Sequence, residues 1–379
     1  MPTLFDETKF SVFAGGKDLP SLLNRLDRIA LEGKQQVQVC VIASKHSILQ
    51  LLRDMESRGS ERITVNEIAD ETTGSLPGNV ATFSLKRRYG VKERKSVSGD
   101  FIVLPDVRGN MNLIIFIEPL VFWHEGLSPL LDSAYPKLVR PFFTQMEMHQ
   151  FVRNTQTALP THRVQVLRTS SRERLKAGDA RKKYASQLKW TDSDADTVFR
   201  EAAANNEWFR SIFFELVFLK EGRLSSDDTF GTISKYGYLS CTRRFNLFYH
   251  SVVEPMMDYG EARLTFLQGR TRTQTTNFIP KPVKIEYPSD VFSSVQQIGK
   301  LLEILKRFKH GSCSVLHGNP YLHVSMLDNY DYSAADVWVL NKNEVLIVPQ
   351  IRTSEASLKR IISHIFENFR EGKLGESRA

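Results

Sequence analysis

Cysteine is scarce in this sequence, and its three residues, Cys40, Cys241 and Cys313, lie far apart. Their number is odd and no C-x-x-C pair occurs, which disfavours both a disulfide framework and a thiolate zinc site. We therefore expect a reducing compartment, the cytoplasm. The first ten residues, MPTLFDETKF, lack a basic segment followed by a long apolar run, so we expect no secretion signal.

Long apolar runs are also missing. The most hydrophobic stretch, LIIFIEPLVFW at 113–123, is interrupted by Glu118 and Pro119 and is too short to cross a bilayer. It predicts a buried strand and the exit from that strand, and we expect no membrane partner.

Several catalytic signatures are absent. Neither G-x-x-x-x-G-K-[ST] nor G-x-G-x-x-G occurs, which disfavours ATP-driven chemistry, and the lack of G-x-S-x-G disfavours a serine hydrolase. The acidic residues Asp336 and Glu344 are spaced as in some nucleases, but Glu344 is followed by Val345 and Leu346, so the E-x-K lysine is missing. Binding is therefore a better hypothesis than catalysis.

What is present is the composition of a globular protein. The chain has 379 residues, of which 41% are hydrophobic and 25% charged, and this length predicts two or three domains. The net charge of +8 favours a polyanionic partner, provided that the positive residues are clustered.

The periodicity of apolar residues predicts a mixed α/β (α+β) fold. We expect helices over 19–32, 44–58, 143–158, 193–205 and 290–308, and strands over 37–43, 163–168 and 208–219, with a polar loop at 224–230. The predicted domains are 1–43, a module at 44–106, a mixed α/β middle domain at 107–284 and a C-terminal unit at 285–379.

The module at 44–106 carries the most specific pattern. Thr64 is expected to cap a short helix over 65–71, with Glu67 completing a capping box, and Asn79 to cap a second helix over 80–89 that ends at Gly90. A basic two-stranded segment, VKERKSVSGDFIVL, follows. This order resembles a winged helix-turn-helix domain, carried by ITVNEIADETTGSLPGNVATFSLKRRYG, although the turn TTGSLPGN is longer than usual for that family.

The resemblance implies a DNA-binding role. The second helix would lie in the major groove and the wing would contact phosphates. The implied contact residues are Thr82, Ser84, Lys86, Arg87, Arg88, Lys92, Arg94 and Lys95. The alternatives are a capped helical hairpin with a solvated basic face, or a winged helix that binds protein.

A second basic cluster lies within 163–189, which we expect to be helical or loop-like from 171 onward. Its dense part consists of Arg172, Arg174, Lys176, Arg181, Lys182 and Lys183. These residues favour contact with nucleic acid, with a solvated charged face as the alternative.

The segment HGNPYLHVSMLDNYDYSAADVW supplies candidate metal ligands for phosphodiester hydrolysis. They are His317, His323, Asp328 and Asp336, to which Glu344 is added. In the alternative interpretation the aspartates mark turns and the histidines are ordinary loop or core residues. We expect no cofactor for a binding protein, and Mg²⁺ or Mn²⁺ for the nuclease alternative.

The C-terminal residues 285–372 predict a helix, three strands and a helix. Strands are expected over 321–327, 335–340 and 344–348, and Pro280, Pro282 and Pro288 predict a boundary or a rigid connector before this unit. Taken together, the sequence predicts a nucleic-acid-binding regulatory or accessory protein, with DNA as the expected partner. A protein partner or a homo-oligomer is compatible with this prediction, and a metal-dependent nuclease is the alternative.

Overall fold

The structure is a computed structural model of the chain. It describes residues 19–33, 36–57, 63–68, 81–90, 94–173, 186–190, 194–205, 207–220, 223–272, 279–318 and 321–376. The chain divides into two compact units. The first unit comprises 1–170, 187–200 and 210–261, and the second comprises 171–186, 201–209 and 262–379. Helices and strands are both abundant, which confirms the predicted mixed α+β class.

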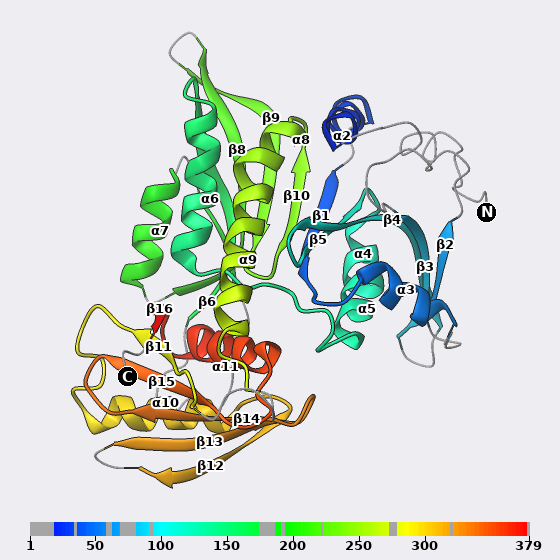
Figure 1. Cartoon of the computed structure of the whole chain (residues 1–379). Helices are drawn as coiled ribbons and strands as arrows, with labels where there is room; N and C mark the ends of the chain where they lie inside the picture. The colour runs from blue at the N-terminus through cyan, green and yellow to red at the C-terminus, as the bar shows by residue number, and fades with distance from the viewer. Residues whose placement is uncertain are drawn as a thin grey trace. The chain divides into compact units, whose positions relative to one another are not determined.

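A ten-stranded sheet, with strand order β2-β3-β4-β5-β1-β10-β9-β8-β6-β7, organises the first unit (Figure 1). Its strands are β1 (Val37–Ala43), β2 (Ile63–Ile68), β3 (Ala81–Tyr89), β4 (Lys95–Arg108), β5 (Met111–Phe116), β6 (His162–Glu173), β7 (Ser186–Lys189), β8 (Glu207–Lys220), β9 (Arg223–Ser234) and β10 (Tyr238–Thr242). Strand β1 pairs antiparallel with both β5 and β10, so it joins the two halves of the sheet.

The centre of the sheet is apolar on both faces. All seven residues of β1 (VQVCVIA) and all six of β5 (MNLIIF) are buried. β-Branched and large apolar side chains favour an extended, covered strand. The predicted strand at 37–43 is confirmed, as is the buried strand that begins the apolar stretch 113–123.

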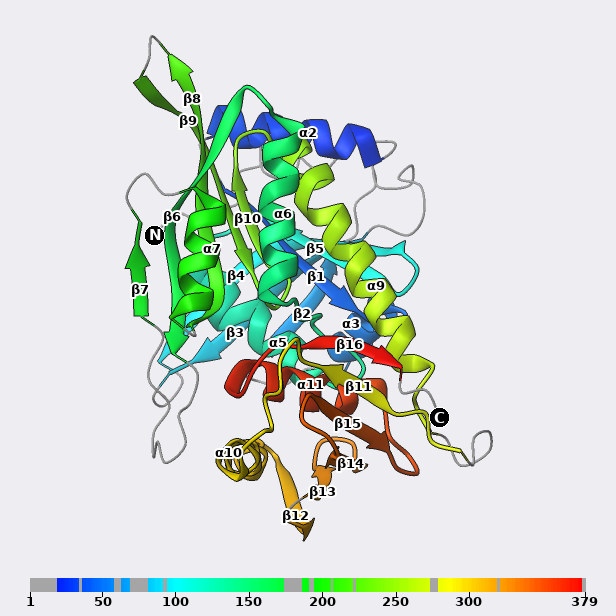
Figure 2. The ribbon, with the colours of Figure 1, turned by 90° about the vertical axis from the view of Figure 1, so that its left-hand side faces the viewer.

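Helices accompany this sheet. They are α2 (Leu19–Gly33), α3 (Ile48–Ser57), α4 (Leu120–Phe122), the π-helical η3 (Trp123–Leu127), α5 (Ser128–Ser133), α6 (Gln145–Ala158), α7 (Ala195–Ala204), α8 (Phe245–Phe248), the π-helical η4 (Tyr249–Val253) and α9 (Glu254–Gln268). Helix α6 begins with a complete capping box formed by Thr144 and Glu147. It runs beside α9, with Phe151 against Tyr259 at 5.6 Å between ring centroids (Figure 1 and Figure 2).

Four sequence predictions are wrong for this sheet. One is the helical or loop-like segment expected over 171–189, because its described residues lie in strands β6 and β7. The helices expected over 65–71 and 80–89 are replaced, where the structure describes the chain, by strands β2 and β3, and the polar loop expected at 224–230 is part of β9. The recognition helix implied by the winged-helix resemblance is therefore absent from 81–89. The expected turn at 73–79 lies outside the described residues. Strand β4 runs continuously across the predicted boundary at 106.

The pattern of β3 explains the error. Phe83 and Leu85 are buried, while Lys86 and Arg88 are exposed, so successive residues of this segment face opposite sides of the sheet. This period of two belongs to a strand. Pairing with β2 on one side and β4 on the other satisfies the backbone of β3, which local capping signals cannot anticipate.

The second unit contains a six-stranded antiparallel sheet with order β12-β13-β14-β15-β11-β16. Its elements are β11 (Val283–Glu286), α10 (Val295–Lys306), β12 (Gly311–His317), β13 (Leu322–Asp328), β14 (Ser333–Val339), β15 (Glu344–Pro349), α11 (Glu355–Asn368) and β16 (Lys373–Glu376). The predicted helix, three strands and helix are present as α10, β13 to β15 and α11. Strands β11, β12 and β16 were not predicted.

Both helices cover one face of this sheet (Figure 2). Alternate strand residues, such as Val324, Val337 and Ile347, are fully buried, whereas their neighbours on the other face are half-exposed. Within the described ranges, no helix is both long and apolar enough to cross a membrane.

Candidate functional site

A cavity of about 400 Å³ lies in the first unit, against strands β6, β8, β9 and β10. Small hydroxyl side chains contribute much of its lining. They are Ser128, Ser170, Ser211, Thr232, Ser234 and Ser240. Aromatic and basic side chains complete the lining and give the cavity its chemical character.

Strand alternation places these hydroxyls. In β9, Thr232 and Ser234 face the cavity and flank the buried Ile233, and in β10 Ser240 faces it beside the buried Leu239. Successive side chains of a strand point to opposite faces, so this part of the sheet has one apolar face and one hydroxyl-bearing face.

The segment after β5 supplies an aromatic wall. Trp123 and His124, at the start of η3, line the cavity together with Leu120 of α4. The Trp123 ring stacks on Tyr238 with centroids 4.8 Å apart, and the Tyr238 hydroxyl donates a hydrogen bond to Oε1 of Gln38 at 2.8 Å. Burial raises the pKa of Tyr238, so its hydroxyl stays protonated and neutral. Single π-helical turns such as η3 are frequent at functional sites.

Arg140 is fixed in the same wall. Its guanidinium lies 5.1 Å from the centre of the Trp123 ring. Its Nη2 donates hydrogen bonds to Oδ1 of Asp132 at 2.9 Å and to Oγ of Ser128 at 2.8 Å. The charge of Arg140 is therefore partly compensated by a neighbouring carboxylate.

Arg168 and Arg210 differ from Arg140 in this respect. Within the described part of the chain, neither guanidinium has a carboxylate within salt-bridge distance, although both line the cavity and are exposed. The Arg168 guanidinium lies 5.2 Å from the Phe213 ring centre, and Phe213 stacks on Phe230. The rim of the cavity thus carries two positive charges for which the described residues supply no carboxylate within salt-bridge distance.

His124 adds a titratable group to this rim. Partial burial, followed by the positive charge of Arg210, lowers its pKa, and the nearby Glu125 opposes this shift. The ring therefore favours its neutral form, which offers one donor and one acceptor. The cavity combines guanidinium groups, hydroxyls and aromatic rings, a set that binds an oxyanion attached to a planar ring.

The basic residues predicted at 82–95 do not form a helical face. Lys86, Arg88, Arg94 and Lys95 are exposed, and Ser84 is half-buried. Thr82 is buried, so it is not available to read DNA bases. Lys92 lies outside the described residues.

Arg87 connects this strand to the cavity wall. Its Nη1 donates to the backbone oxygen of Glu125 and lies 3.8 Å from Oε2 of the same residue. Because Glu125 belongs to η3, Arg87 holds β3 against the segment that carries Trp123 and His124.

The second basic cluster is mostly outside the described residues. This applies to Arg174, Lys176, Arg181, Lys182 and Lys183, while the backbone of Arg172 lies in β6. The functional roles predicted for these residues remain predictions.

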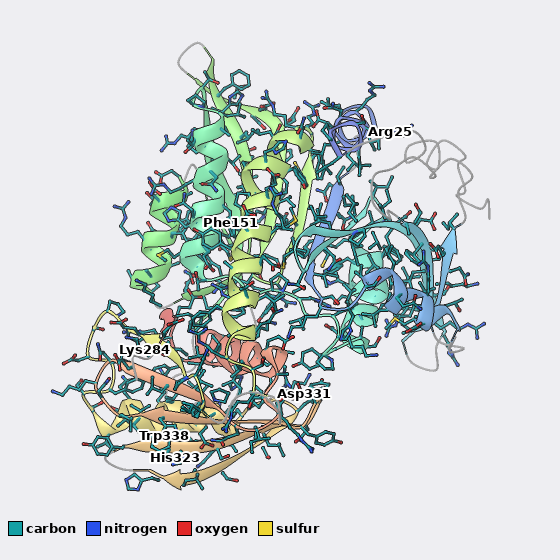
Figure 3. The ribbon with its side chains drawn as sticks, viewed as in Figure 1. Arg25, Phe151, Lys284, His323, Asp331 and Trp338 are labelled. Carbon is teal, nitrogen blue, oxygen red and sulfur yellow. The ribbon has the colours of Figure 1, made fainter. Side chains whose placement is uncertain are left out.

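The predicted histidines and acidic residues of the C-terminal unit do not form one site, because His317, His323 and Asp336 lie on neighbouring strands while Asp328 and Glu344 are held by other partners. His323 stacks on Trp338 with ring centroids 3.9 Å apart, and its Nε2 lies 3.2 Å from Oδ2 of Asp336 (Figure 3). His317 is opposite His323 in the register of β12 and β13. Asp328 is fully buried and forms an ion pair with Arg360.

Glu344 is held elsewhere, by Nδ2 of Asn341 at 2.6 Å and by Lys284. Two of the aspartates cap turns, as the alternative interpretation expects. Asp328 accepts a hydrogen bond from the backbone of Tyr330, and Asp331 accepts one from the backbone of Ser333. Among the described residues, no three or more His, Cys, Asp or Glu side chains are arranged so that they could hold one metal ion.

Sequence reasoning missed the cavity residues Trp123, His124, Arg140, Arg168 and Arg210. One usable signal was the alternation of hydroxyl and apolar residues in GTIS and YLSC, which predicts a strand face that is polar without being charged. No family model matches this chain, and no curated protein is found to be similar to it.

Proposed function

We propose that this protein binds nucleic acid, and that the cavity of the first unit receives a phosphorylated nucleotide of the bound strand. The observation that carries the proposal is the pair Arg168 and Arg210, whose guanidinium groups line a cavity without a carboxylate partner among the described residues. An arginine fork matches the geometry of phosphate oxygens and forms charge-assisted hydrogen bonds with them.

The hydroxyl groups support a phosphate or sugar ligand. Ser211, Thr232 and Ser240 lie on neighbouring strands and face the same space. A hydroxyl both donates and accepts, so these side chains can bond phosphate oxygens or sugar hydroxyls in several orientations.

The aromatic groups favour a nucleotide over a simple inorganic anion. Trp123 and Phe213 both line the cavity, and each lies beside an arginine. Stacking of a base on an aromatic side chain contributes about 1–3 kcal/mol. The volume of about 400 Å³ falls within the common range for small-ligand pockets.

The wider charge distribution supports a polymer. The chain has a net charge of +8, and the exposed Lys86 and Arg88 lie on β3, which Arg87 links to η3. Exposed lysines and arginines of this kind bind a phosphate backbone without regard to its sequence. DNA is the partner that the sequence predicts, and a regulatory or accessory role in the cytoplasm belongs to the same proposal.

The test compares two double variants of equal charge. Arg168→Gln/Arg210→Gln removes the uncompensated charges of the cavity. Arg153→Gln/Arg200→Gln removes two exposed charges from α6 and α7 of the same unit. Fluorescence anisotropy with a labelled single-stranded DNA of ten nucleotides, at two salt concentrations, reports the affinities.

We expect the cavity variant to bind at least tenfold more weakly than the control variant, because hydrogen bonds to charged groups contribute about 1.5–3 kcal/mol each. The cavity variant should also show a smaller salt dependence than the unmodified protein. Equal affinities of the two variants would show that the cavity takes no part in binding.

A further inference from the structure

We infer that the cavity holds the end of a strand, a terminal nucleotide that carries a phosphomonoester, and not an internal nucleotide. This inference rests on the proposed function and specifies its ligand. It draws on the charge, the shape and the hydrogen-bonding groups of the cavity.

The charge of the cavity matches a dianion. Arg140 is paired with Asp132, whereas Arg168 and Arg210 have no carboxylate partner among the described residues, which leaves two uncompensated positive charges. An internal phosphodiester carries one negative charge. A terminal phosphomonoester carries about 1.5 to 2 negative charges at neutral pH. The monoester therefore neutralises the pair, and the diester leaves an excess of positive charge.

The hydrogen-bonding capacity leads to the same ligand. A phosphomonoester presents three terminal oxygens, one more than a diester. The guanidinium groups of Arg168 and Arg210 and the hydroxyls of Ser170, Ser211 and Ser234 all line the cavity. The third terminal oxygen of a monoester gives these donors an additional acceptor that a diester lacks.

The shape restricts how a strand enters. Side chains of four adjacent strands line one side of the cavity, and α4, η3 and α5 provide another wall. The sheet closes one side of the cavity, so a strand that continues in both directions has to stay on the side that is open. An internal nucleotide would have to be flipped out of the strand, which costs a few kcal/mol of unstacking where the strand is stacked, whereas a strand end inserts without this cost.

The volume of the cavity fits a single nucleotide. A volume of about 400 Å³ is near the lower limit of small-ligand pockets, which range over about 300–1,000 Å³. We therefore expect one nucleotide with its phosphate to occupy the cavity, with the rest of the strand outside it.

A competition assay tests the inference on the full-length protein. A labelled ten-nucleotide DNA that carries phosphate at both ends is displaced by unlabelled DNA of the same sequence in four forms. The competitors are 5′-phosphorylated, 3′-phosphorylated, hydroxyl-ended at both termini, and circular. The assay is repeated with Arg168→Gln/Arg210→Gln and with the control Arg153→Gln/Arg200→Gln. All four arginines are exposed, so the variants should fold.

We expect one of the two phosphorylated linear forms to compete at least tenfold better than the hydroxyl-ended and circular forms. The control variant should retain this advantage and the cavity variant should lose it. Equal competition by all four forms, with affinity still reduced in the cavity variant, would overturn end recognition and leave the proposed function intact. If the cavity variant binds the labelled DNA as the control does, both the proposed function and this inference fall.

Discussion

At the residue scale, the presence or absence of a carboxylate separates structural arginines from those available to a ligand. Arg53 makes two hydrogen bonds to Glu67, at 2.6 and 2.7 Å, and Arg108 contacts both Glu254 and Asp258. Such pairs neutralise their charges within the fold. Because Arg168 and Arg210 lack this partner among the described residues, their charge remains for an external anion.

The first prediction concerns His124 and pH. Burial and the Arg210 charge lower the pKa of the free imidazole, with Glu125 acting in the opposite direction, and Arg140 and Arg168 line the same cavity. A bound phosphate would favour the protonated ring and raise that pKa. Affinity should therefore increase as the pH falls through the histidine range, by about tenfold for each pKa unit gained on binding.

The ligand titrates in the opposite sense, because a phosphomonoester loses its second charge near pH 6. The measurement must separate the two groups. Affinities of the unmodified protein and of His124→Gln are compared between pH 5.5 and 8. Their ratio isolates the contribution of the imidazole, and a ratio that is constant over this range would contradict the prediction.

The second prediction concerns the ion pair inside the C-terminal unit. Asp328 is fully buried, and the Arg360 guanidinium that contacts it lies between Phe308 and Tyr330, at 4.7 and 4.6 Å from the ring centres. Arg360→Ala would leave the carboxylate buried without a counter-charge, so we expect a loss of about 3–5 kcal/mol in the free energy of unfolding.

Urea unfolding measures that loss, and Asp328→Asn/Arg360→Ala is the matched comparison. Removing both charges avoids the uncompensated carboxylate, so the double variant should be more stable than Arg360→Ala alone. Equal stability of the two would show that the carboxylate charge is not the source of the loss.

At the scale of elements, the helices and strands that could be predicted from the sequence are those with a regular apolar pattern and a clear end signal. Helices α2, α6 and α11 have one apolar face each, and β1 and β5 are fully buried strands in which most residues are apolar. Strands β2 and β3 were mistaken for helices because capping residues are local signals, whereas strand pairing depends on partners far away in the chain. A strand with a polar face, such as β9, was read as a loop for the same reason.

The cavity was beyond local prediction because its residues come from segments that only the sheet brings together. His124 follows β5, Arg168 lies in β6 and Arg210 lies in β8. Each residue is unremarkable in its own segment. Their convergence requires the strand order β10-β9-β8-β6, which periodicity does not supply.

The third prediction compares two glycines in regular elements. In β9, a Cβ atom at Gly231 would lie 2.5 Å from Cζ of the buried Phe214 ring, while a Cβ atom at Gly299 in α10 would meet nothing within 4 Å. We expect Gly231→Ala to destabilise the protein by about 1–3 kcal/mol through overpacking. Gly299→Ala should stabilise it by about 0.5–1 kcal/mol through helix propensity.

Thermal unfolding of the two alanine variants beside the unmodified protein checks the opposite signs. Phe214→Leu combined with Gly231→Ala serves as the control, since a smaller, flexible side chain gives the new methyl group room. The explanation fails if this control does not reduce the effect of the added methyl group relative to Phe214→Leu alone.

At the scale of the whole molecule, each of the two units has its own sheet and its own apolar core. The ten-stranded sheet of the first unit carries the cavity, and the six-stranded sheet of the second leaves one face half-exposed, with His323 and Trp338 stacked on it. The three cysteines are distributed over both units. Cys40 and Cys241 lie in β1 and β10, and Cys313 lies in the edge strand β12.

The last prediction uses these thiols to follow both units in one experiment. Burial raises the pKa of the Cys40 thiol to about 12, raises that of Cys241 well above its ordinary value, and raises that of Cys313 to a smaller extent. The thiolate is the reactive form, so only the half-exposed Cys313 should react with a disulfide reagent in the native protein. We expect one thiol to react natively and all three in denaturant, with none reacting natively in Cys313→Ser.

Because Val37 of β1 pairs with Cys241, and β1 itself contains Cys40, the two buried thiols should become reactive together as urea opens the sheet. Rapid native labelling of Cys40 or Cys241 would contradict the buried core of the first unit.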